Sequence, residues 1–487
     1  MLENLQPQRV FYYFEKMCQI PHGSRNTKQI SDFCVDFAKA HNLEYHQDAD
    51  NNVIIIKEAT AGYENADAVI IQGHLDMVCE KTADCTKDME KEGLDIYVDG
   101  DEVRARDTTL GGDNGIAVAM AMAILEDDTL SHPRVEAVFT VDEEIGLLGA
   151  GSIDVSPLKG KTMINIDSED EGIFTVSCAG GNVADCRLPL QTVKYTGTVY
   201  EIEITGCKGG HSGVEIDKGR SNANVLMGRV LQDIDLCVKN RINEGIAIAS
   251  VEGGLKDNAI PVQSKAVLAC NDVQAAELIQ KSVSGMQTVF ANEYATADAG
   301  IKISLTKIQV TDLAVMDEES TQKAICLLTC MPNGIQTMSM DIENLVQTSL
   351  NMGIVKTENE QLQISFCVRS SVDSEKEMVN RRIGTLMEQL GGTMEIDGDY
   401  PGWEYKKDSK LRDLMIEVFK EQYRKEPKVE AIHAGLECGM FAGKIPGLDC
   451  VSIGPDLRQI HTVRESMSIS SVQRVYEFVL EVLKRIK

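Results

Sequence analysis

Short apolar strands and helix-like stretches alternate through the first third of the chain, and this alternation limits the fold more than any other feature. Apolar, often β-branched stretches occupy 51–59, 66–73, 134–141 and 161–167, and a helix-like stretch occupies 114–127. Strands that alternate with helices predict a mostly parallel central sheet covered by helices. We therefore expect an α/β fold.

The alternation is interrupted in the middle of the chain. There, strands with alternating apolar and polar residues lie between longer helical stretches such as 221–238 and 374–390, which indicates an α+β domain. The first pattern then returns up to the C-terminus. Because the ends of a domain usually lie near one another, we predict an α/β domain from 1–181 and 404–487 that is interrupted by an inserted α+β domain from 182–403.

Charge and composition argue against several classes of protein. The 487 residues include 48 basic and 76 acidic side chains, and the net charge of −28 disfavours nucleic acid and anionic membranes as partners. No apolar run is long enough for a membrane span, and the N-terminal sequence lacks the pattern of a secretory leader. The 14 cysteines are scattered without a C-x-x-C pair, which predicts a reduced, cytoplasmic location.

Acidic and histidine side chains recur where the expected strands of the outer domain end. In open α/β sheets, ligands bind beyond the carboxyl ends of the strands, so five separate strands would direct these groups to one rim. Two histidines and several carboxylates together suit a pair of divalent ions. A single strand-end histidine would instead indicate a structural residue, and a single acidic turn would indicate ordinary turn chemistry. The candidates are His74, Asp76, Asp113, Glu143, Glu144, Asp167 and His461.

Glu143 and Glu144 are neighbours, which bears on their roles. Adjacent side chains of an extended chain point in opposite directions, so two functional glutamates at these positions would have different functions. An isolated acidic turn would be read as solvated surface.

Several motifs resemble those of the co-catalytic zinc metallopeptidase family, which includes aminoacylases, carboxypeptidases and dipeptidases. Two further stretches, "AGLECG" and "YPGW", are similar to the bacterial cytosolic dipeptidases of that family, which act on aminoacyl-histidine and other dipeptides. The resemblance covers nearly the whole chain and implies a catalytic domain interrupted by a lid domain. The motifs are "GHLDMV", "GGDNG", "DEEIGLLGA", "NIDSED", "GGHSG" and "HTVRE".

The resemblance implies a set of metal ligands: His74 and Asp167 for one ion, Glu144 and His461 for the other, and Asp113 as the bridge. Glu143 would then be the general base that takes a proton from a water shared by the ions, because a ligand has no free lone pair for that proton. Asp76 would accept the second ring N–H of His74 and fix its orientation.

The inserted domain offers groups for substrate binding. His211, in the glycine-rich "GGHSG", would donate to the developing oxyanion, although an isolated loop histidine would be read as surface. Arg369 would bind the free carboxylate of a dipeptide in a bidentate manner. Asn224 and Asn258 are weaker candidates for hydrogen bonds to the substrate, and Glu437 for contact with its amine.

The predicted activity is metal-dependent hydrolysis of unblocked dipeptides, including Xaa-His dipeptides such as carnosine. Two alternatives stay open: a deacylase for N-acyl amino acids, and a non-catalytic metal-binding protein, which the presence of every catalytic position disfavours. Zinc is the expected metal, although manganese or cobalt would suit the same ligands. The resemblance leaves open a homodimer formed through the lid, and it implies no nucleic acid or membrane partner.

Overall fold

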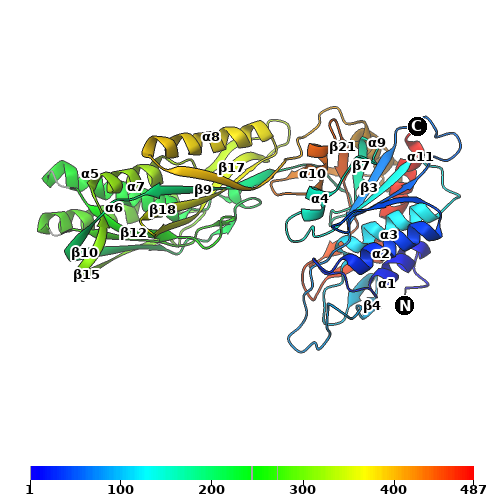
Figure 1. Cartoon of the computed structure of the whole chain (residues 1–487), viewed down its shortest axis with the longest axis horizontal. Helices are drawn as coiled ribbons and strands as arrows, with labels where there is room; N and C mark the ends of the chain where they lie inside the picture. Colours follow the sequence, from blue (N-terminus) through cyan, green and yellow to red (C-terminus); the bar gives the residue numbers. More distant parts are fainter. Residues whose placement is uncertain (1, 243–244, 271) are drawn as a thin grey trace. The chain divides into compact units, whose positions relative to one another are not determined.

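The computed structural model describes residues 2–242, 245–270 and 272–487, which form two compact units (Figure 1). Unit 1 comprises Met1–Cys178, Trp403–Ala431 and Leu436–Lys487, and unit 2 comprises Ala179–Gly402 and Ile432–Gly435. Helices and sheets occur in both units, which confirms the α/β class.

An eight-stranded sheet forms the centre of unit 1. Its order is β1-β2-β6-β3-β7-β21-β8-β20. Strands β6, β3, β7 and β21 pair in parallel, and the pairs β1-β2, β2-β6 and β21-β8 are antiparallel. The parallel part of the sheet is therefore its central four strands. The bounds are β1 (Glu44–Gln47), β2 (Val53–Lys57), β3 (Val69–His74), β6 (Val135–Thr140), β7 (Thr162–Asn165), β8 (Ile173–Cys178), β20 (Lys428–Ile432) and β21 (Asp449–Ser452).

Helices of unit 1 pack against this sheet and against one another. Helix α3 lies along β3 and α1 (Figure 1), and its residues from Asn114 to Leu125 are all buried because they are almost entirely apolar. The start of α3 is therefore held in place by a rigid, enclosed helix. The bounds are α1 (Gln8–Met17), α2 (Lys28–Ala40), α3 (Gly112–Glu126), α4 (Leu148–Ser152), α9 (Lys410–Tyr423), α10 (Glu437–Lys444) and α11 (Ile469–Arg485).

A second, four-stranded sheet in unit 1 was not predicted from the sequence. Its order is β22-β23-β5-β4, so a hairpin near residue 100 pairs with a segment more than three hundred residues later. This pairing holds the chain around His461 beside the loop that precedes α3. The bounds are β4 (Ile96–Asp99), β5 (Glu102–Ala105), β22 (Leu457–Arg458) and β23 (Ser466–Ser468).

Unit 2 contains a nine-stranded antiparallel sheet with four long helices. Its order is β15-β10-β14-β12-β17-β18-β9-β19, with β16 paired to β17, and β11 pairs separately with β13. Apolar residues of the sheet and of the helices form a large core, and Val199, Ala269 and Val315 of the sheet form a separate small cluster. The bounds are β9 (Gly180–Pro189), β10 (Thr192–Thr205), β11 (Gly210–His211), η1 (Ile216–Lys218), α5 (Ala223–Ile242), β12 (Ala247–Gly253), β13 (Ala259–Ile260), β14 (Ser264–Ala269), α6 (Val273–Glu293), β15 (Lys302–Met316), α7 (Glu318–Cys330), β16 (Gly334–Met338), β17 (Val346–Glu358), β18 (Gln361–Ser370), α8 (Asp373–Leu390) and β19 (Thr393–Tyr400).

Four residues from the C-terminal part of the chain also belong to unit 2. The segment Ile432–Gly435 begins at the last residue of β20 and ends two residues before α10, and the rest of β20 and all of α10 belong to unit 1. The backbone N–H of Ala179 donates to the carbonyl oxygens of Ile432 (3.2 Å) and Ala434 (3.0 Å). Unit 2 is therefore built from two separate pieces of the chain.

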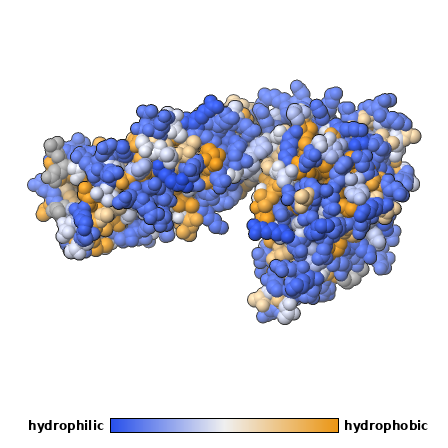
Figure 2. All heavy atoms as spheres, viewed as in Figure 1, coloured by the Kyte–Doolittle hydropathy of each residue, from blue (hydrophilic) through white to orange (hydrophobic). Residues whose placement is uncertain are grey.

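The surface agrees with the acidic composition. The face shown in Figure 2 is mostly hydrophilic, and its hydrophobic residues lie in small scattered groups. Among the helices that the structure describes, none has the length and apolar character to cross a membrane.

Candidate metal and catalytic site

Five of the predicted site residues lie beyond the carboxyl ends of the central parallel strands. His74 is the last residue of β3, Glu143 and Glu144 follow β6, Asp167 follows β7, and His461 lies in the chain after β21. Asp113 lies in the first turn of α3, after Gly111 and Gly112, as its position at the start of the helix-like stretch predicts. The rim is thus formed by four strands and one helix start.

The first group of possible ligands consists of His74, Asp113 and Asp167. Nε2 of His74 lies 3.3 Å from Oδ1 of Asp113 and 3.5 Å from Oδ1 of Asp167. Nδ1 of the same ring lies 2.9 Å from the backbone oxygen of Asp76. A proton on Nδ1 would be donated to that oxygen, which leaves the Nε2 lone pair directed at the carboxylates, as a metal ligand requires.

The second group consists of Asp113, Glu144 and His461. Nε2 of His461 lies 3.1 Å from Oδ2 of Asp113 and 3.0 Å from Oε1 of Glu144. Asp113 therefore contributes one oxygen to each group. A carboxylate that faces two sets of donors is what a bridge between two ions needs.

The donor chemistry of both groups fits divalent cations. Each group offers one imidazole nitrogen and carboxylate oxygens within 4.8 Å of one another. Imidazole and carboxylate are ligands that zinc accepts. Hydrogen bonds to Asp113 and Glu144 raise the pKa of His461 to about 10 in the absence of a cation, and burial raises the pKa of Asp167 to about 6. A cation and protons would thus compete for these side chains.

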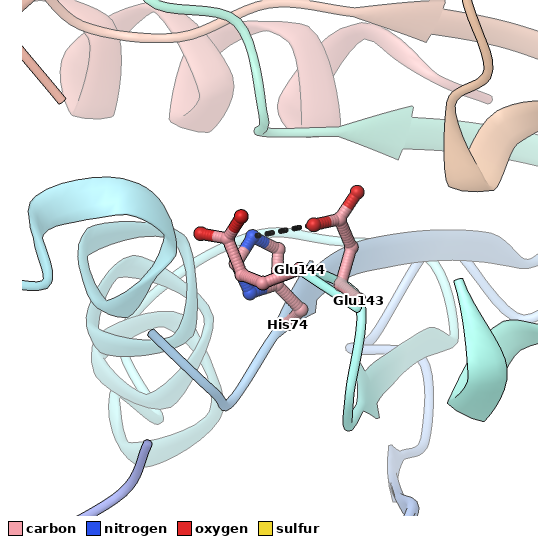
Figure 3. A group of neighbouring side chains, drawn as sticks. All are labelled: His74, Glu143 and Glu144. Atoms are coloured by element: carbon pink, nitrogen blue, oxygen red, sulfur yellow. Dashed lines mark ion pairs between the residues drawn. The ribbon is translucent and has the colours of Figure 1, made fainter. Parts of the chain in front are cut away.

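Glu143 belongs to a third group of possible ligands, with His74 and Glu144, but its carboxylate does not share the position of the Glu144 carboxylate (Figure 3). Figure 3 shows the two carboxylates on different sides of the His74 imidazole, as expected for neighbours in sequence. Oε2 of Glu143 is 3.9 Å from Nε2 of His74, farther from that nitrogen than the carboxylates of Asp113 and Asp167. Burial raises the pKa of Glu143 well above its ordinary value. Such a carboxylate is suited to accept and return a proton.

Asp76 contacts the His74 ring and also the turn that follows β6. Its carboxylate lies 3.5 Å from Nδ1 of His74, and its backbone oxygen lies 2.9 Å from the same nitrogen. The carboxylate also accepts the backbone N–H groups of Glu143 (3.0 Å) and Glu144 (3.4 Å) and the hydroxyl of Ser24 (2.8 Å). Asp76 therefore holds the turn that carries both glutamates, and its role in orienting His74 stays a prediction.

Glu465 is a residue of the site that sequence reasoning missed. Its two oxygens accept backbone N–H groups of Leu110 (2.8 Å), Gly111 (3.2 Å), Gly112 (2.8 Å) and Asp113 (3.4 Å). The side chain is buried, and burial raises its pKa to about 7. Glu465 therefore fixes the loop that presents Asp113. The "HTVRE" motif contains Glu465, but only the folded chain reveals its partners.

Glu437 is enclosed within unit 1. Its Oε2 accepts hydrogen bonds from Gln72 (2.5 Å) and from Oγ1 of Thr140 (2.8 Å), whereas no described residue bonds Oε1. Burial raises the pKa of Glu437 to about 7. The predicted contact with a substrate amine stays a prediction, and the free Oε1 is the atom that could make it.

His211 has a defined donor atom in unit 2. Its Nδ1 accepts backbone N–H groups of Gly213 (3.1 Å) and Val214 (3.2 Å), so the ring proton of the neutral form lies on Nε2. Burial and the charge of Arg369 lower the pKa of His211, which favours that neutral form. The imidazole consequently presents an N–H donor, as its predicted role with an oxyanion requires.

Arg369 and His433 lie near His211 in unit 2. Arg369 is buried, its Nη1 donates to the hydroxyl of Tyr400 (3.2 Å), and its Nε has no partner among the described residues. His433 is also buried, and its Nε2 lies 2.8 Å from Oγ of Ser349, the residue opposite Arg369 in the sheet. The proximity of His433 to Arg369 could not be predicted from sequence, because His433 comes from the short second piece of unit 2.

The two predicted asparagines have contacts of other kinds. Asn224 is fully buried, and its side-chain amide donates to the carbonyl oxygens of Gly253 (3.3 Å) and Met352 (3.2 Å). Asn258 is exposed, and its carbonyl accepts the N–H of Ser212 (2.9 Å). These bonds connect Asn224 to the sheet and Asn258 to the His211 loop, and substrate binding by either residue stays a prediction.

Comparison with known proteins finds relatives that extend over the whole chain. The cytosol non-specific dipeptidase of Escherichia coli is 35% identical over 491 aligned residues, which cover 100% of this chain and 99% of that protein. The crystal structure of an aminoacylhistidine dipeptidase from Vibrio alginolyticus superimposes with a TM-score of 0.90 at 32% identity and covers 100% of this chain and 98% of that one. An aminopeptidase from Bacillus cereus shares the fold, with a TM-score of 0.55 at 15% identity, over 99% of both chains.

The sequence pattern of one family extends over most of the chain, from residue 70 to residue 485. Together with the relative at 35% identity, this match confirms the resemblance found in the sequence motifs. The chain belongs to Peptidase family M20/M25/M40.

Proposed function

We propose that the protein is a metal-dependent dipeptidase that hydrolyses unblocked dipeptides in the cytosol. The observation that carries this proposal is the position of Asp113, which faces His74 and Asp167 with one oxygen and Glu144 and His461 with the other. The names of the two full-length relatives, both dipeptidases, support the substrate class. Zinc is the proposed metal, because two imidazoles and three carboxylates suit it.

Two bound ions would lower the pKa of water and polarise the carbonyl of the scissile bond. The protein supplies the movement of the proton. Glu143 accepts a proton from the attacking water at its carboxylate and returns it to the leaving amine, which its position beside the ligand groups and its raised pKa allow. Asp76 keeps the Glu143 backbone fixed during both transfers through the hydrogen bond to its N–H.

Unit 2 supplies the groups that recognise the ends of the substrate in this proposal. Arg369 binds the free C-terminal carboxylate, for which it has a buried guanidinium with an unused Nε–H among the described contacts. His211 donates its Nε2–H to the oxygen that becomes negative during attack. The free Oε1 of Glu437, in unit 1, is the proposed acceptor for the substrate amine.

A substrate panel tests the proposal. Dipeptides, tripeptides, N-acetyl amino acids and dipeptide C-terminal amides are compared on protein that has been treated with a chelator and then restored with zinc, manganese or cobalt. We expect hydrolysis of free dipeptides only after metal is restored. Turnover of N-acetyl amino acids without turnover of dipeptides would identify a deacylase instead.

The Arg369→Ala variant gives the panel its internal control. A charged hydrogen bond contributes about 1.5–3 kcal/mol, so the variant should lose roughly 10- to 150-fold in kcat/KM on free dipeptides. The C-terminal amides, which carry no carboxylate, should lose far less. Equal losses on both substrates would show that Arg369 has only a structural role.

A further inference from the structure

A cavity of about 590 Å³ opens in unit 1 beside the candidate metal site. Glu144, a proposed ligand, and Ile145 form one part of its wall, and the segment around Arg25 forms another. A loop that includes Met89, Glu90 and Lys91, here called the outer loop, forms a third part of the wall. The volume lies within the range of about 300–1,000 Å³ that small-molecule sites occupy. No residue of this cavity other than Glu144 has a role in the mechanism described above.

The lining of the cavity combines apolar side chains with charged side chains of both signs. Met77 is buried, Val78 is half-buried, and Ile145 is 40% exposed, so these side chains offer apolar surface to a ligand. Met77 and Met89 are flexible thioethers, which adapt to apolar groups of different shape. The lining also includes Arg25 and Lys91, and Glu80 and Glu90. With both signs present, the lining does not select one charge.

Hydrogen bonds hold the walls of the cavity to the catalytic turn. The hydroxyl of Ser24 donates to Asp76, the same carboxylate that accepts the N–H groups of Glu143 and Glu144. The backbone N–H of Arg25 donates to the carboxylate of Asp142 at 2.5 Å. These bonds join the cavity residues Ser24 and Arg25 to the turn that carries Glu143 and Glu144.

The outer loop is also attached. The side-chain amide of Asn26 donates to the carbonyl oxygen of Glu90 (3.1 Å), and Gly23 forms a β-bridge with Met77. A ligand would therefore meet a site that is already formed, which lowers the entropic cost of binding.

We propose that this cavity receives the side chain of the first residue of the dipeptide and favours long apolar side chains over glycine there. The inference rests on the proposed dipeptidase function and adds a specificity site to it. The carbonyl that is attacked belongs to the first residue, so the side chain next to that carbonyl is the nearest one to the ligands. The second residue carries the carboxylate that we assign to Arg369 of unit 2. A cavity whose wall is Glu144 is thus within direct reach of the first side chain.

Two substrate series test the inference. One series varies the first residue (glycine, alanine, leucine, methionine) before a constant alanine, and the other varies the second residue after a constant alanine. We expect the wild-type protein to prefer methionine or leucine to glycine at the first position by about 10- to 200-fold in kcat/KM, as apolar pockets discriminate in other enzymes. The second series should show a smaller spread.

The variant Met89→Trp fills the cavity from the outer loop, at a residue that contacts none of the proposed ligands in the described hydrogen bonds. We expect it to lower kcat/KM for Met-Ala by about tenfold or more and to change that for Gly-Ala by less than about twofold. The matched control is Met340→Trp, because Met340 of unit 2 is 94% exposed and lies outside the cavity. The control should leave both values unchanged.

The possible results separate the inference from the proposed function. If dipeptides are hydrolysed but Met89→Trp leaves the Met-Ala to Gly-Ala ratio at the wild-type value, the cavity is not the first-residue site. A change of preference confined to the second-residue series overturns the inference as well. If the wild-type protein hydrolyses no dipeptide after metal is restored, the proposed function falls and the inference falls with it.

Discussion

The carboxylate of Asp76 accepts the backbone N–H of Glu143 at 3.0 Å. The residue two positions after a candidate ligand, His74, thus holds the turn that carries the proposed base. Asp76→Asn keeps the size of the side chain but replaces one acceptor oxygen with a donor. We expect turnover to fall by about 10- to 100-fold, as is typical when a residue that orients ligands is lost.

Ser24→Ala is the control for Asp76→Asn, since it removes one hydrogen bond to Asp76 and leaves the carboxylate in place. It should reduce turnover much less. Metal content by mass spectrometry and kcat are measured for both variants. If both values for Asp76→Asn equal those of the wild type, Asp76 has no role in the site.

Substitutions of the neighbours Glu143 and Glu144 should have different effects, one on turnover and the other on metal binding. Glu143→Gln is expected to keep both metal ions and to lose about 10²- to 10⁴-fold in turnover, because the general base is lost. Glu144→Gln removes an oxygen that lies 3.0 Å from His461 and should reduce the metal content of the second group. Metal analysis and kcat on the two proteins check this pair. Near-native turnover by Glu143→Gln would contradict the assignment of the base.

Glu465 should affect both metal positions at once. Glu465→Gln weakens the four backbone hydrogen bonds that hold residues 110–113, and Asp113 belongs to both groups of possible ligands. We expect the affinity for both ions to fall by about 10- to 100-fold in a chelator competition experiment.

Asp449→Asn is the matched control for Glu465→Gln. Asp449 is also a buried carboxylate that accepts a backbone N–H, that of Leu411, but it holds the start of α9. It should lower the thermal stability and leave metal affinity unchanged. If both variants weaken metal binding equally, Glu465 acts only through general stability.

His211→Ala should lower kcat and kcat/KM together, by about 10²- to 10³-fold, because an oxyanion donor acts mainly in the transition state. Both metals should stay bound. A variant with unchanged kcat would reduce the "GGHSG" turn to a structural feature.

Mixing His211→Ala with Glu143→Gln tests the source of the imidazole. Recovery of activity in the mixture would show that His211 serves a second copy of the chain, as in a homodimer. An inactive mixture of proteins that exchange subunits would show that each chain uses its own His211.

His433 should make the protein less stable as the pH falls. Burial, with the charges of Arg369 and His211, lowers the pKa of His433 from 6.5 to about 3. Between these values the unfolded chain binds a proton that the folded protein does not, so stability is complete above pH 6.5 and is lost toward pH 3. His433→Gln does not titrate. The difference in free energy of unfolding between wild type and variant should therefore shift by up to about 1.4 kcal/mol per pH unit in that window. Parallel urea-unfolding curves across pH 7 to 5 would contradict the prediction.

The candidate ligands could be predicted because they are tied to strand ends. His74, Glu144 and Asp167 follow buried apolar runs that the sequence displays directly, and the carboxyl ends of parallel strands meet at one edge. Asp113 could be predicted in the same way, because two glycines precede it at the start of the helix-like stretch that forms α3. The α/β class followed from the same periodicity. Local pattern was sufficient wherever one strand or helix sets the position of a side chain.

Contacts between distant backbone segments could not be predicted. Glu465 binds N–H groups more than three hundred and fifty residues earlier in the chain, through a pairing of short strands whose sequences carry no distinctive pattern. The partner of Asp76 also depends on the exact shape of the turn at Glu143. The buried position of Asn224 follows from packing within unit 2. In each case the sequence supplies the polar group, and the tertiary fold selects its partner.

The second piece of unit 2, Ile432–Gly435, has a consequence for dissection of the molecule. A fragment comprising residues 179–402 would lack His433, the partner of Ser349, and the carbonyl groups that bind the N–H of Ala179. Replacing the same residues with a short linker would leave those four residues exposed in the remaining protein. The inserted region is therefore not an exchangeable cassette, and swapping it between relatives requires the tetrapeptide to be exchanged along with it.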